Sequence, residues 1–162
     1  MIILYGENDI SDPYRKSVDE AVSCGIRHIG ISTYSSGKVK TFLMNKGFSE
    51  DVAADAVREL IINRYIDDMK AAQKVLRTRT DRKQESAAFI YNRLIEAGIA
   101  EDVADSICDE LPPDKETCKA LYRSLDPVAN PEDRREDYLR LASRRGYTYE
   151  TASSAFNAFL NE

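Results

Sequence analysis

Apolar residues recur along the chain at spacings of three and four, the pattern of helices that bury one face. The pattern is clearest in three stretches that each follow a glycine, namely Gly47, Gly98 and Gly146. These stretches align without gaps over fourteen residues, and the first two share seven of the fourteen letters. The glycines lie 51 and then 48 residues apart, so the sequence predicts a repeated helical unit.

Each repeated stretch carries the signals of one helix ending and another beginning. The glycine suits the position after a helix, where the backbone needs a positive φ. Ser49 and Thr148 then stand where a side-chain oxygen can cap the next helix, and acidic residues follow in its first turn. Ala100 occupies the equivalent position and has no side-chain acceptor, so we expect that helix to have the weakest start.

Two further helices complete each unit. One of them ends at the glycine, and the other lies before that helix in the sequence. We expect Asp67 and Asp114 to cap the first helices of the second and third units, and Pro131 to open a helix as its first residue. The prediction is therefore an all-α fold of nine helices.

The nine helices are expected to form three tandem three-helix repeats at residues 14–65, 66–112 and 113–162. A unit of about 50 residues is marginal alone, so the repeats should stack into an elongated, curved body. Residues 1–13 are expected to form an N-terminal arm or a short strand.

Composition narrows the class of protein without naming a function. Hydrophobic residues make up 43% of the 162 residues, enough for a core, and the net charge of −5 does not favour general nucleic-acid binding. The three cysteines and the single histidine, His28, support neither a disulfide framework nor a zinc site. No stretch resembles a signal peptide or a membrane span, so we expect a monomer in the cytoplasm that does not bind a membrane.

The sequence gives no evidence of a catalytic site. It contains no nucleophile with a paired base, no pair of carboxylates spaced for acid–base catalysis and no glycine-rich loop of the kind that binds phosphate. We therefore expect a protein that is not an enzyme, with no cofactor and no metal.

Charge is distributed unevenly along the middle of the chain. Residues 69–93 hold seven basic and two acidic residues, whereas residues 94–116 hold eight acidic residues and one lysine. A second basic set lies in residues 134–145, interspersed with acidic residues. The candidate partner-binding residues are Arg77, Arg79, Arg82, Lys83, Arg134, Arg135, Arg144 and Arg145. The alternative is a solvated loop and an exposed helix face with local salt bridges, each of which contributes little.

Three groups of residues resemble motifs of the RecX family. They are Ser35-Ser36 followed by Val39-Lys40 and Leu43-x-x-Lys46-Gly47-Phe48, then Tyr65-Ile66-Asp67-Asp68, and finally Arg144-Arg145-Gly146-Tyr147-Thr148-Tyr149-Glu150. The resemblance covers residues 14–162. It implies three tandem three-helix repeats, and a protein that binds the filament of RecA on single-stranded DNA and inhibits or modulates recombination, DNA repair and SOS activities.

Two other functions remain open on the residues alone. One is a general helical scaffold for protein interactions, and the other is direct binding of single-stranded DNA through the basic segment around Arg79. Family members are often basic whereas this chain is acidic, so contact with RecA itself is the firmer expectation.

Overall fold

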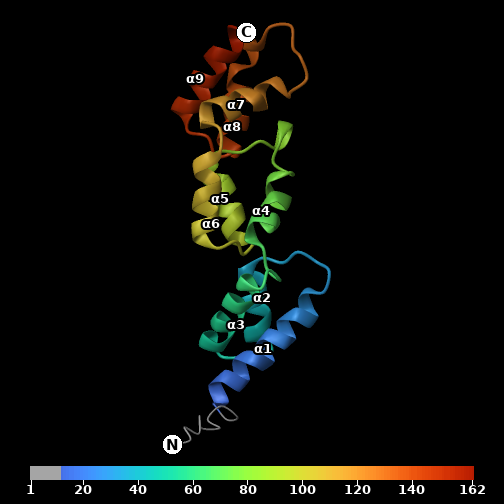
Figure 1. The fold of residues 1–162 in the computed structure, drawn as a ribbon. Helices are drawn as coiled ribbons and strands as arrows, with labels where there is room; N and C mark the ends of the chain where they lie inside the picture. Colours follow the sequence, from blue (N-terminus) through green and yellow to red (C-terminus); the bar gives the residue numbers. More distant parts are fainter. Residues whose placement is uncertain (1–11) are drawn as a thin grey trace, which may run out of the picture. The chain divides into compact units, whose positions relative to one another are not determined.

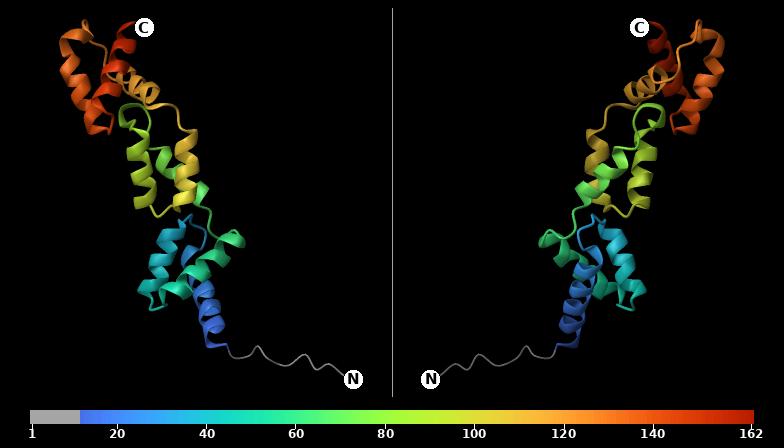
Figure 2. Two further views of the ribbon diagram at one scale, coloured as in Figure 1. Left: turned by 90° about the vertical axis from the view of Figure 1, so that its left-hand side faces the viewer. Right: turned by 90° about the vertical axis from the view of Figure 1, so that its right-hand side faces the viewer.

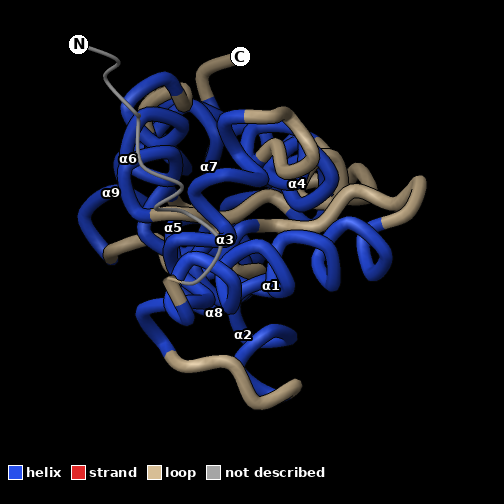
Figure 3. Tube along the Cα trace, turned by 60° about the horizontal axis from the view of Figure 1, so that its bottom comes forward, coloured by secondary structure: helices blue, strands red, loops and turns tan. Residues whose placement is uncertain are grey.

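The computed structural model describes residues 12–162, and within them it is all-helical, as expected (Figures 1 and 3). Nine α-helices and two short 3-10 helices make up the described chain, and no strand occurs in it. The α-helices are α1 (Pro13–Ile29), α2 (Ser36–Asn45), α3 (Glu50–Ile62), α4 (Asp68–Leu76), α5 (Ala87–Glu96), α6 (Glu101–Glu110), α7 (Asp114–Arg123), α8 (Arg135–Arg144) and α9 (Tyr149–Leu160). The 3-10 helices are η1 (Asp81–Lys83) and η2 (Pro131–Arg134). The predicted N-terminal arm lies, except for its last two residues, outside the described residues.

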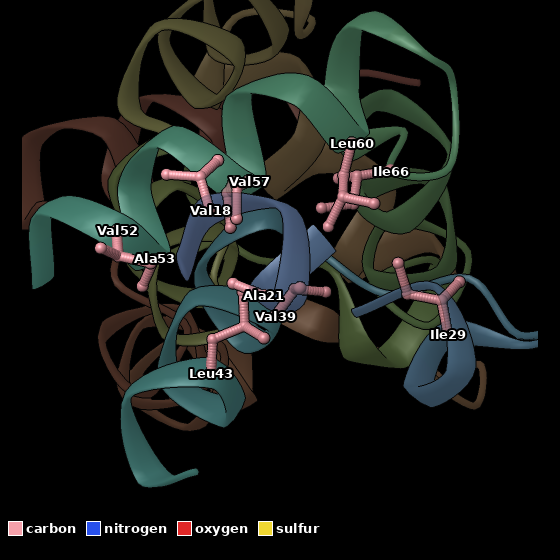
Figure 4. Close-up of a cluster of buried hydrophobic side chains, with 11 residues drawn as sticks. Val18, Ala21, Ile29, Val39, Leu43, Val52, Ala53, Val57, Leu60 and Ile66 are labelled. Carbon is pink, nitrogen blue, oxygen red and sulfur yellow. The ribbon is translucent and has the colours of Figure 1, made fainter. Parts of the chain in front are cut away.

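The chain divides into two compact units, Met1–Asp68 and Met69–Glu162. The described part of the first unit contains α1, α2 and α3, and these three helices bury one apolar core (Figure 4). Val18, Leu43 and Leu60 are almost fully buried there. At Gly25 helix α1 comes so close to α3 that a Cβ atom would lie 2.8 Å from Leu60.

The second unit contains the remaining six helices and two apolar cores. One core joins residues of α4, α5 and α6, including Ala72, Ile90 and Ile107. The other joins α7, α8 and α9, which Figure 2 shows grouped in orange and red. In this last core Tyr122 packs edge-on against Phe156, with ring centroids 5.9 Å apart.

Each core is thus formed mainly by three consecutive helices, which is the grouping that the repeats predict. Ile66 crosses the predicted boundary, because it packs in the first core although the repeat pattern places it at the start of the second repeat. The boundaries of the repeats and their stacking into an elongated, curved body stay predictions.

The helix signals around the three glycines are confirmed. Gly47, Gly98 and Gly146 have φ values of 104°, 84° and 89°. Ser49 Oγ accepts a hydrogen bond from Val52 N, and α6 begins after Ala100 without a side-chain cap, as its residue type predicts. The local sequence therefore sets these three helix starts.

Two aspartates cap helices other than their own. The backbone N–H of Ser36, at the start of α2, donates to Asp68 Oδ1 over 2.7 Å, and the Ser36 hydroxyl donates to Asp68 Oδ2 over 2.5 Å. Likewise the N–H of Ala87, at the start of α5, donates to Asp114 Oδ1 over 2.8 Å. In both cases the aspartate is the first residue of the helix that begins the next three-helix group.

Two expected helix starts differ in detail. Pro113 occupies the N-cap position of α7, so Asp114 is already helical and its carboxylate reaches Ala87 and not its own helix. Pro131 opens the 3-10 helix η2, and the α-helix begins only at Arg135. A proline fits the first turn of either helix type, because its missing N–H would be unpaired in both.

Candidate binding surface of the second unit

The basic segment at residues 77–83 connects α4 to α5, as predicted, and contains η1. Helix η1 packs against α7, so the segment is held against the rest of the second unit. Its arginines differ in role, since a cation that holds the segment in place is not free to bind a partner.

Arg79 lies in an ion-pair network around a buried carboxylate. Glu85 is 3% exposed and accepts two hydrogen bonds from Arg93, at 2.5 Å from Nε and 2.6 Å from Nη2. Arg79 Nη1 lies 3.8 Å from the same carboxylate. A buried carboxylate is tolerated only when paired in this way, so Arg79 and Arg93 stabilise Glu85. The pairing also raises the pKa of Arg93.

Arg82 and Arg145 connect the basic segment to two other loops. Arg82 Nη2 lies 2.5 Å from Asp126 Oδ1, and its Nε donates to the Ser124 carbonyl over 3.2 Å. Arg145 Nη2 donates to the Arg82 carbonyl over 2.7 Å, and the N–H of Ser86 donates to the Arg145 carbonyl over 3.0 Å. These contacts hold η1 against the loops that follow α7 and α8.

Arg134 and Arg135 also interact within the chain. Arg134 Nε donates to Asp137 over 2.7 Å, and this hydrogen bond lowers the pKa of Asp137. The Arg135 guanidinium lies over the ring of Phe156, 5.0 Å from its centroid, and donates to Ser153 over 2.9 Å. Arg135 thus covers the third apolar core.

Two of the candidate residues line one groove. Arg82 and Arg134, far apart in sequence, border a groove of about 360 Å³ whose apolar lining includes Leu125, Val128 and Leu141. Each arginine is paired with an aspartate at the groove, so the groove carries both charges along its edge.

Three candidate residues remain exposed and unpaired within the described chain. Arg77, Lys83 and Arg144 are exposed, and none takes part in an ion pair with another described residue. They are the candidate cations whose charge is available to a partner.

The sequence did not reveal Glu85 and Asp126, the carboxylates that pair with Arg79 and Arg82. A single acidic residue before a helix or in a loop gives no signal of its distant partner.

The remaining candidate chemistry is structural. His28 stacks on Phe42 with centroids 3.6 Å apart, and Cys118 is fully buried, which raises the pKa of its thiol to about 11. Among the described residues there is no group of three or more histidine, cysteine or acidic residues placed to hold a metal ion. None of the described helices is long and apolar enough to cross a membrane.

Comparison with known proteins gives a consistent result. The chain is 33% identical over 146 residues to regulatory protein RecX of Lactococcus lactis subsp. cremoris (strain SK11), covering 80% of this chain and 54% of that protein. It is 23% identical over 137 residues to regulatory protein RecX of Pelodictyon phaeoclathratiforme (strain DSM 5477 / BU-1), covering 83% and 86%. No family model matches the chain.

Relatives from Bacillus are longer than this chain. Regulatory protein RecX of Bacillus mycoides (strain KBAB4) is 23% identical over 109 residues, and the match spans only 40% of its length. Among solved structures, RecX from Lactobacillus salivarius matches with a TM-score of 0.67 at 15% identity, over 91% of this chain and 99% of that one. The fold is therefore shared along nearly the whole chain.

The fold of the described residues and these relatives together define the class, an all-helical protein that is similar to proteins named regulatory protein RecX. The matches on both sequence and fold agree on one family within that class. The chain is similar to RecX proteins in both sequence and fold.

Proposed function

We propose that this protein binds the RecA filament on single-stranded DNA and inhibits or modulates its activities in recombination, DNA repair and the SOS response. The observation that carries the proposal is the agreement of sequence and fold with RecX proteins over most of the chain. The protein acts by binding and not by catalysis, as a monomer in the cytoplasm.

The contact with the filament includes the exposed cations of the second unit. Arg77, Lys83 and Arg144 supply unpaired positive charge for acidic groups of the filament or for DNA phosphates. The other five candidates each contact residues of the same chain, so their first role is to shape this surface. They bind the partner only where those contacts leave a donor free.

Titration of the purified full chain into RecA on single-stranded DNA tests the proposal. We expect DNA-dependent ATP hydrolysis and strand exchange to fall at substoichiometric to near-stoichiometric amounts, with co-sedimentation of the chain on the filaments. Unchanged ATP hydrolysis without co-sedimentation would overturn it. A pull-down that returns another protein in place of RecA would favour a general helical scaffold.

A triple charge reversal, R77E/K83E/R144E, tests the surface. We expect weaker co-sedimentation, because the reversal replaces three positive charges with negative ones where contact is proposed. The matched control K16E/R27E/K115E makes the same change at exposed residues elsewhere, none of them in an ion pair within the described chain. If both variants lost co-sedimentation equally, the cause would be the change in net charge, and these three residues would not be part of the binding surface.

A further inference from the structure

A small pocket lies beside the basic segment, where the connection from α4 to α5, the first turn of α5 and the start of α7 meet. Its volume is about 170 Å³. Thr80 and Pro112 are exposed and mark its mouth, whereas Ile90 and Thr117 are buried. Such a volume equals that of about five or six water molecules, and it is below the range of about 300–1,000 Å³ for sites that hold drug-sized ligands. The pocket therefore suits a single small ring.

The walls of the pocket are mostly apolar. The apolar side chains come from α4, from α5 and from the linker between α6 and α7: Leu76, Ala87, Ile90, Leu111 and Pro112. A flat ring that enters buries its faces against these side chains and releases water. The walls thus favour an occupant with apolar faces.

Three polar side chains at the pocket have hydrogen-bonding groups without a partner in the described chain. Arg79 Nε is buried and makes no hydrogen bond there. The Thr80 hydroxyl does not cap η1, and the Gln84 amide makes no side-chain hydrogen bond with another described residue. Because a buried donor without an acceptor is costly, the pocket favours an occupant that carries acceptors and donors along one edge.

The charged groups of the pocket already have counter-groups. Glu85 accepts two hydrogen bonds from Arg93 and also lies beside Arg79. The Asp114 carboxylate accepts the N–H of Ala87 at the start of α5, where the helix dipole is positive. An anion would meet these two carboxylates, and a cation would meet the two guanidinium groups. The balance of charge therefore favours a neutral occupant.

Two exposed cations flank the mouth of the pocket. Arg77 and Lys83 lie three residues before and three residues after Thr80, and neither is in an ion pair with another described residue. Three residues span at most about 11 Å even when fully extended. A molecule with a neutral ring in the pocket can thus place negative charge outside it, beside either cation. A nucleotide combines these two parts, a neutral base and a phosphate.

We propose that this pocket binds one pyrimidine base of single-stranded DNA, with the neighbouring phosphates at Arg77 and Lys83. The faces of the base lie against the apolar walls. Its edge carries acceptors and donors for Arg79 Nε and the Gln84 amide. The inference rests on the proposed function only in taking the DNA of the filament as the source of the base, and binding to DNA can be measured without RecA.

The experiment titrates a short oligothymidine into the isotope-labelled full chain, followed by NMR. An abasic oligomer of the same length keeps the phosphates and lacks the bases. We expect only the oligothymidine to shift the signals of Thr80, Ala87 and Thr117, and to bind about five-fold or more tightly than the abasic oligomer, because one ring leaves water. Thymidine monophosphate should cause the same shifts with lower affinity, since it lacks the neighbouring phosphates.

Variants separate the pocket from general attraction to DNA. Ala87→Leu fills the pocket and leaves every cation in place, so it should lower the affinity for oligothymidine by about five-fold. Ala88→Leu adds the same side chain at the next, exposed position of α5 and should leave the affinity unchanged. Thr80→Val removes one exposed hydroxyl and should weaken binding by about three-fold, which provides a test even if Ala87→Leu fails to fold.

Three outcomes would overturn the proposal. One is equal affinity for the oligothymidine and the abasic oligomer. Another is unchanged affinity of Thr80→Val together with equal affinity of folded Ala87→Leu and Ala88→Leu. The third is tighter binding of thymidine monophosphate than of the oligomer, which would assign the pocket to a free nucleotide. RecA is absent from all of these measurements, so they succeed or fail separately from the filament titration.

Discussion

Asp68 is a buried residue whose carboxylate completes the start of another helix. It is 8% exposed and accepts from both the backbone N–H and the hydroxyl of Ser36. Together with Ile66, which packs in the first core, it gives a physical reason for the Tyr65-Ile66-Asp67-Asp68 motif.

We expect Asp68→Ala to lower the free energy of unfolding by about 1–3 kcal/mol, because two buried donors lose their acceptor. Asp114→Ala should lower it less, since one half-buried donor is affected. Asp51→Ala is the matched control, as it also removes an acidic residue from a first helical turn but one that is exposed. Urea unfolding measures all three. A loss no greater for Asp68 than for Asp51 would show that only the helix dipole is at work.

Two of the repeated glycines differ in their surroundings, and this difference separates backbone strain from steric contact. Gly47 has a φ of 104° and nothing within 4 Å of an added Cβ, whereas at Gly146 that atom would meet Phe89 at 2.4 Å and Ser86 at 2.5 Å.

Gly47→Ala should therefore destabilise the protein by about 1 kcal/mol through the positive φ alone. Gly146→Ala should destabilise it further, because Ser86 is fully buried and cannot move aside freely. Thermal unfolding of the two variants compares them directly. Equal shifts in Tm would mean that the contact between Gly146 and Phe89 relaxes without cost.

At the scale of the helix, α6 begins with the backbone of a capped helix but without the cap. Ala100 has φ −60° and ψ 143°, close to the φ −65° and ψ 160° of Ser49, whose side chain does cap α3. The position is therefore already shaped for a serine.

Ala100→Ser should raise the free energy of unfolding by about 0.5–2 kcal/mol, the usual value of an N-cap. Denaturant unfolding checks the gain, and Ser49→Ala should give a loss of similar size in the first unit. If Ala100→Ser changes nothing, the first turn of α6 is already satisfied by other groups.

The helices could be predicted from the sequence because their signals are local. The glycines at helix ends, the capping side chain of Ser49 and the apolar faces each involve residues within a few positions of one another. The carboxylate of Asp114 could not be assigned in this way, because the N–H it serves lies 27 residues away in the sequence. Pairing over that distance depends on the packed fold.

The candidate site shows the same limit at larger scale. The sequence located the basic segment at residues 77–83 between two helices, which is confirmed. It did not separate Arg79, which lies beside Glu85, from the exposed Arg77, because both are arginines in one short run. That separation requires the positions of acidic residues from other parts of the chain.

For the whole molecule, the net charge of −5 hides opposite charges within the second unit. Within the part of the chain that the structure describes, Arg77, Lys83 and Arg144 are cations outside any ion pair, while the charged residues of α6 are all acidic. Binding to the phosphates of bare single-stranded DNA should therefore be weak and confined to the cations.

If these three cations bind phosphates directly, R77E/K83E/R144E should reduce the slope of log affinity against log salt by about 0.7 for each phosphate that is no longer neutralised. Fluorescence anisotropy with an oligothymidine at several salt concentrations measures it. An unchanged slope would mean that DNA is not bound through these residues, and would leave the RecA protein as their partner.

The carboxylates that complete α2 and α5 have a consequence for synthesis on the ribosome. Asp68 emerges 32 residues after Ser36, and Asp114 emerges 27 residues after Ala87. A growing chain that has reached only the end of α3 thus holds an α2 in which the N–H of Ser36 still lacks the Asp68 carboxylate. The first two groups of helices are each completed by the first residue of the next group, so we expect their folding to finish only after translation of the following group has begun.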